Sequence, residues 1–175
     1  MFGLSTLGVV HTLISLAALA AGVACLFRAG RITPRRRSGA LYVLLTVLSC
    51  LTSFGIVAHG GFGKAHALAV LTLATLVVAS VAGAGARFRR RARAVEAVAY
   101  SASLLFHMIP GVTETLTRLP HAHPVVDGPD APALQAVNFL MLVAFVLGAW
   151  YQVRRLGESD AGAALEVRIA GLPRG

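Results

Sequence analysis

Six histidines are the residues of this sequence best suited to chemistry. Imidazole nitrogen ligates haem iron and transition metals, and its charge changes near neutral pH. Two of the six, His11 and His107, fall inside long apolar runs, where ionisable side chains are costly and usually functional or paired. The other four flank a glycine-rich turn or lie in a later loop: His59, His66, His121 and His123. The chain's pattern places all six in the outer half of the molecule.

Two cofactor hypotheses follow. In the first, two of the candidate ligands His11, His66 and His107 bind a b-type haem between facing helices. In the second, His59, His66, His107 and Glu114 form a small transition-metal site near the outer surface. No complete ligand spacing accompanies either set. A structural interpretation therefore stays open, in which each ring hydrogen-bonds a neighbouring Ser or Thr and binds nothing else.

Other motifs add little to these hypotheses. His121 and His123, with Asp127 and Asp130 nearby, form a weak metal pattern in a proline-rich loop. The sequence contains no GxSxG, HExxH, Walker or dinucleotide-binding fingerprint. Conventional hydrolase or nucleotide chemistry therefore has no support, and we do not predict an enzyme.

Five long apolar runs must position the histidines. The chain is 57% hydrophobic and 13% charged, with a mean hydropathy of +0.75. A bilayer core about 30 Å thick needs about 20 helical residues, and every run reaches that length. We therefore predict an all-α, polytopic transmembrane bundle over residues 1–156. Its five spans are residues 4–27, 39–58, 65–86, 94–116 and 133–153.

Arginine clusters predict the orientation of these spans. All but two of the 16 Lys and Arg residues lie after the first, third and fifth runs, and the exceptions are Lys64 and Arg118. The positive-inside rule then places the N-terminus outside and the C-terminus in the cytoplasm, as a multi-pass protein of the bacterial inner membrane. The net charge of +9 is explained by this juxtamembrane bias. We expect the lipid bilayer, and no nucleic acid, as partner.

Local signals refine these boundaries. Ser38 is the expected N-cap of the second span. Pro110 and Gly111 interrupt the fourth run, where we expect a kinked helix that continues to about Thr117. Beyond Pro110, Glu114 and Arg118 have the i, i+4 spacing of a helical ion pair. The polar residues 157–175 predict a weakly ordered cytoplasmic tail.

Small and weakly polar residues recur at three- to four-residue spacing and predict the faces that pack together in lipid. The second span carries Tyr42, Thr46, Ser49 and Ser53 in such a stripe. The fourth carries Ser103, His107, Gly111, Glu114 and Arg118.

Part of the sequence resembles a known family. The similar segments are Pro34–Tyr42, Leu51–Ile56 with its Ser-Phe pair, the Gly61–His66 opening of the third span, and Ala67–Leu73. Over residues 8–118 the chain resembles a bacterial family of multi-pass integral membrane proteins without an assigned function. The stretch His107–Pro120 looks like a subgroup signature. The chain differs where relatives often carry cytoplasmic histidines, since arginines occupy 35–37 and 89–91. The resemblance implies location and span number, without an activity.

Two functional hypotheses remain. The first is a small redox or haem-binding membrane protein that uses the histidines of the outer half. The alternative is a non-catalytic membrane component, such as a small transporter, accessory subunit or sensor. In it, the Pro110–Gly111 interruption with Glu114 and Arg118 lines a polar cavity. Either protein could form a homo- or hetero-oligomer within the membrane, and the sequence does not identify a substrate.

Overall fold

The computed structural model describes residues 5–56, 62–85, 90–118 and 124–170. Within these ranges the chain forms five α-helices and no strand, which confirms the all-α prediction. Each helix has the length and composition to cross a membrane. The helices are α1 (Thr6–Ala29), α2 (Arg37–Phe54), α3 (Lys64–Gly85), α4 (Arg90–Arg118) and α5 (Pro132–Ala170).

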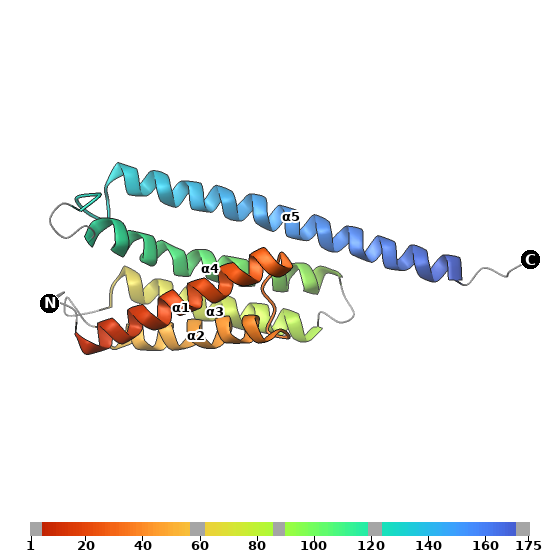
Figure 1. Ribbon diagram of the computed structural model, residues 1–175, viewed down its shortest axis with the longest axis horizontal. Helices are drawn as coiled ribbons and strands as arrows, with labels where there is room; N and C mark the ends of the chain where they lie inside the picture. The colour runs from red at the N-terminus through yellow and green to blue at the C-terminus, as the bar shows by residue number, and fades with distance from the viewer. Residues whose placement is uncertain (1–4, 57–61, 86–89, 119–123, 171–175) are drawn as a thin grey trace, which may run out of the picture.

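Helices α1 to α4 form an antiparallel bundle, and α5 lies along α4 (Figure 1). The end of α1, the start of α2, the end of α3 and the start of α4 meet at one end of the bundle (Figure 1). We call this the arginine end. Its described arginines are Arg28, Arg31, Arg35, Arg36, Arg37, Arg90, Arg91 and Arg93. The opposite end, where α1, α3 and α5 begin, is the histidine end.

Two fully buried tyrosines occupy the centre of the bundle. Tyr42 of α2 and Tyr100 of α4 pack with Leu104 in the apolar core. Gly22 of α1 makes room for them, because a Cβ atom there would lie 2.8 Å from Leu104 and 2.9 Å from the Tyr42 ring. Most Leu and Val side chains on the outer surfaces are exposed, as expected for helices solvated by lipid.

Helix α2 is shorter than predicted at one end and longer at the other. It stops at Phe54 rather than at residue 58, because the Gly55 N–H bonds the Thr52 carbonyl (3.2 Å) and tightens the last turn. It starts at Arg37, so Ser38 is not its N-cap. The Arg36 N–H donates to the Thr33 carbonyl (3.2 Å), and that turn begins the helix earlier.

The fourth span continues through Pro110 as predicted, and α4 runs on to Arg118. The prediction of a weakly ordered tail is wrong for residues 157–170, where α5 remains helical. The segment is rich in Ala, Leu and Glu, which have high helix propensity and outweigh its two glycines. At 1.5 Å per residue, the 39 residues of α5 extend about 58 Å, well beyond the bundle at the arginine end (Figure 1).

Candidate functional site

His11 and His107 lie on two helices that contact each other, α1 and α4. His107 is buried and His11 is partly buried. The Nδ1 atom of His11 lies 2.9 Å from the Thr52 hydroxyl on α2. We call His11 and His107 the histidine pair.

Neighbouring hydroxyls fix the tautomer of His11. The single hydroxyl hydrogen of Thr52 is directed to the carbonyls of Leu48 and Ser49, each 2.9 Å away. Thr52 Oγ1 therefore accepts from His11, so Nδ1 carries the ring proton and Nε2 is the basic nitrogen. Nε2 lies 3.5 Å from the Ser15 hydroxyl, which is also 2.6 Å from the Ser49 hydroxyl.

His66 lies in the first turn of α3 and caps that helix. Its Nδ1 accepts a hydrogen bond from the Gly63 N–H (3.1 Å), as the third residue of a capping box does. The ring stacks against Phe54 at 6.0 Å and Phe62 at 5.4 Å between centroids. His66 thus ties the end of α2 to the start of α3. The Ser-Phe and Gly-x-x-x-x-His features that carry the family resemblance include two residues of this stack.

The remaining candidate ligands are distributed as follows. His59, His121 and His123 lie outside the described residues. Among the residues described, no group of three or more His, Cys, Asp or Glu side chains is close enough to hold a metal ion. Glu114 forms the predicted ion pair with Arg118 (2.5 Å), and its charge also acts on His11. Asp127 and Asp130 are exposed in the loop before α5.

An apolar groove lies beside the histidine pair, between α1 and α4. Its volume is about 250 Å³. Leu16 and Leu19 of α1 form one wall, and α4 forms the other with Met108, Gly111, Val112, Thr115 and Leu116. Contact between α1 and α4 is therefore incomplete next to the pair. The groove is lined by apolar groups, in contrast to the polar cavity predicted at Pro110–Gly111.

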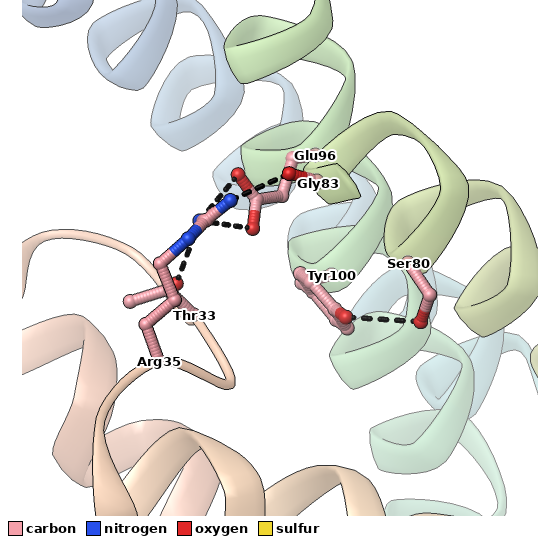
Figure 2. A network of polar contacts seen from close by, with 6 residues as sticks. All are labelled: Thr33, Arg35, Ser80, Gly83, Glu96 and Tyr100. Carbon is pink, nitrogen blue, oxygen red and sulfur yellow. Dashed lines mark hydrogen bonds and ion pairs between the residues drawn. The ribbon is translucent and has the colours of Figure 1, made fainter. Parts of the chain in front are cut away.

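Hydroxyl groups continue from the histidine pair through the centre of the bundle. The Tyr42 hydroxyl lies 2.8 Å from Ser103 Oγ, and Ser103 also contacts the Tyr100 carbonyl at 2.8 Å. The Tyr100 hydroxyl lies 3.2 Å from Ser80 Oγ on α3 (Figure 2). All of these groups except Ser80 are buried.

The arginine end contains an ion pair with a buried carboxylate, which sequence reasoning missed. Arg35, from the loop between α1 and α2, donates to both oxygens of Glu96 on α4, at 2.8 and 3.1 Å (Figure 2). It also donates to the Gly83 carbonyl at the end of α3 (2.6 Å) and to Thr33 Oγ1 (3.3 Å). The Glu96 side chain is 6% exposed and that of Arg35 is 56% exposed. The available signal was Glu96 itself, one of two acids inside the fourth apolar run.

A second buried polar group joins α5 to the bundle. Gln152 donates to the Gly30 carbonyl at the end of α1 (2.8 Å) and accepts from Ser101 of α4 (3.1 Å). Three helices therefore meet at one amide side chain, which is 7% exposed.

No protein-family model, curated protein or solved structure matches this chain.

Proposed function

We propose that the chain is a five-span protein of the bacterial inner membrane, with its arginine end in the cytoplasm and its N-terminus outside. Apart from Arg118 at the end of α4, the described arginines that flank α1 to α4 lie at one end of the bundle, which supports this orientation. A reporter active only in the cytoplasm should be active when fused after Arg37 and silent when fused at Gly128. The reverse pattern would invert the orientation.

We further propose that the protein is a small transporter or sensor component that responds to protons, rather than an enzyme. The observation that carries this proposal is the presence of two histidines inside the bundle on contacting helices, with His107 buried and His11 2.9 Å from the Thr52 hydroxyl. Histidine is the side chain that ordinarily ionises between pH 5 and 8. Adding a proton to one ring places a charge in an apolar interior, and charging both rings makes them repel.

The surroundings of the pair favour a structural response to that charge. On α2, Thr52 and Ser49 present hydroxyl groups to α1, while α4 contributes the charges of Glu114 and, beyond it, Arg118. The groove beside the pair leaves α1 and α4 incompletely packed. Protonation therefore favours a conformation in which these helices separate at the histidine end and water reaches the imidazoles.

The test is the thermal stability of the purified protein between pH 8 and pH 5. The wild type should lose stability as the pH falls, and a His11→Gln, His107→Gln double variant should lose less. The matched control is His66→Gln, which removes a histidine outside the pair and keeps the acceptor that caps α3. Equal pH dependence of the wild type and the double variant would refute the proton response.

A second candidate function is a haem protein, because His11 and His107 come from facing helices. The pair would supply the two imidazole ligands, while His66 already accepts the Gly63 N–H. Because α1 and α4 contact each other, a porphyrin between the rings would require these helices to move apart. Haem would supply one-electron redox chemistry. Protein purified after expression with added haem should show a Soret band that His107→Ala abolishes; protein without such a band excludes this candidate.

A further inference from the structure

Polar side chains form a file of two rows through the interior of the bundle, one row on α2 and one on α4. On α2 the file consists of Tyr42, Thr46, Ser49 and Thr52, spaced three or four residues apart. On α4 it consists of Glu96, Tyr100, Ser103 and His107, also spaced three or four residues apart. From Glu96 to His107, the α4 row rises about 17 Å, a little over half of the roughly 30 Å thickness of a bilayer core.

The α2 row is cross-linked at three levels, twice to α1 and once to the α4 row. At the histidine end, His11 joins Thr52 at 2.9 Å. One turn further in, Ser15 and Ser49 are 2.6 Å apart. At the centre, Tyr42 and Ser103 are 2.8 Å apart. Each of these contacts involves a hydroxyl group, which both donates and accepts hydrogen bonds.

Thr46 marks a break in the file that points to water. The Thr46 side chain is fully buried (0% exposed) and lies one helical turn from Tyr42 on α2. Its Oγ1 atom forms no hydrogen bond with the described protein groups. Buried polar atoms are nearly always satisfied, and a bound water is the usual partner of an orphan. Thr46 lies between the Ser15–Ser49 level and the Tyr42–Ser103 level, where a water molecule would connect them.

The arginine end supplies an acid at the other end of the file. Glu96 precedes Tyr100 by one helical turn, so the two side chains occupy the same face of α4. The guanidinium of Arg35 donates to both oxygens of the Glu96 carboxylate (Figure 2). Because the Arg35 side chain is 56% exposed, this end of the file reaches the accessible surface of the protein.

We propose that this file conducts protons between the histidine pair and Glu96, so that the transported substrate is the proton itself. The inference rests on the proposed function in one respect, because it uses the histidine pair as the outer proton acceptor. Each hydroxyl or water takes a proton from one neighbour as it passes its own to the next. The protein therefore ends each passage chemically unchanged, and no oxidant or reductant is consumed.

The test uses the full-length protein in liposomes loaded with a pH-sensitive dye. A potassium gradient with valinomycin drives and charge-compensates proton movement. Wild-type vesicles should acidify at least tenfold faster than protein-free vesicles. Thr46→Val and Ser103→Ala, which remove one hydroxyl each from the file, should lower that rate at least fivefold.

The matched control is Thr75→Val. The Thr75 hydroxyl bonds only the Leu71 carbonyl of its own helix (2.8 Å) among the described contacts. This variant should conduct protons as the wild type does. Size-exclusion profiles and melting temperatures confirm that each variant is folded before its rate is compared.

The outcomes separate this inference from the proposed function. The proton path is overturned if vesicles with the wild-type protein acidify no faster than protein-free vesicles. It is also overturned if Thr46→Val and Thr75→Val give equal acidification rates. The stability comparison between the wild type and the His11→Gln, His107→Gln variant does not depend on proton transport. If stability depends on pH as proposed but the liposomes show no proton transport, the sensor proposal stands and the proton path is refuted.

Discussion

The two ends of the bundle are held together by different chemistry. At the arginine end, long side chains cross between helices: Arg35 reaches Glu96 and the Gly83 carbonyl, and Gln152 reaches the Gly30 carbonyl. At the histidine end, shorter neutral groups make the interhelical contacts, as between His11 and Thr52. The arginine end thus satisfies carbonyls at the ends of two helices, while the histidine end leaves a groove between α1 and α4.

The difference follows from what each environment permits. A charged or amide side chain near the membrane surface keeps access to water and can still bond buried helix ends. Deeper in the bilayer, hydroxyls and neutral imidazoles are the less costly polar groups. The arginine end is therefore suited to fixing helix positions, and the histidine end to changing them. Substitutions at the two ends should separate these roles.

The largest effect should come from Arg35→Met, which leaves the Glu96 carboxylate buried without its cation. We expect a loss of about 1–3 kcal/mol in the free energy of unfolding, moderated by the half-exposed position of Arg35. Titration with dodecylsulfate in mixed micelles measures it. Arg36→Met is the control, since Arg36 is exposed and its side chain does not cap α2. Equal losses for the two variants would show that the ion pair is not what stabilises this end.

The next effect should come from Gly83→Ala, which crowds the same ion pair from α3. The new Cβ atom would lie 2.8 Å from Glu96 Oε1, so the carboxylate must move. We expect a loss of about 1–2 kcal/mol in the same titration. Gly85→Ala meets no atom within 4 Å and should be neutral or slightly stabilising. A stable Gly83→Ala variant would contradict the observed position of Glu96.

A smaller effect is expected for Gln152→Leu, which removes the amide that joins α5 to α1 and α4. Interhelical hydrogen bonds in membranes contribute about 0.6 kcal/mol on average, so a loss of about 0.5–1.5 kcal/mol is expected. Gln135→Leu is the control, because Gln135 is exposed and bonds only the Asp130 carbonyl of the preceding loop among the described residues. Equal changes in the free energy of unfolding for the two substitutions would show that Gln152 does not anchor α5 to the bundle.

The smallest effect should come from His66→Ala at the histidine end. It removes the Gly63 cap and the stacking against Phe54, at a cost of about 0.5–1 kcal/mol. His66→Gln keeps an acceptor for the cap and should recover part of the loss. A melting temperature lower for His66→Gln than for His66→Ala would argue against the capping role.

The sequence predicted the helices because apolar length and composition determine which segments suit the bilayer. It also identified His11 and His107 as the two histidines inside apolar runs, and the structure places both within helices. It did not predict the pairing of Arg35 with Glu96, because their positions differ by 61 residues and no helical period connects them. The predicted helix ends were wrong where local hydrogen bonds set them, as at Gly55. The tail prediction was wrong because a polar segment can still be helical when many of its residues have high helix propensity.

Cysteine labelling in intact cells tests most directly whether the two ends face opposite sides of the membrane. In a background with Cys25→Ala and Cys50→Ala, a membrane-impermeant maleimide should label Val125→Cys at once. It should label Arg36→Cys only after the inner membrane is opened. Labelling of Arg36→Cys in intact cells, with Val125→Cys protected, would contradict a cytoplasmic arginine end and an outward histidine pair.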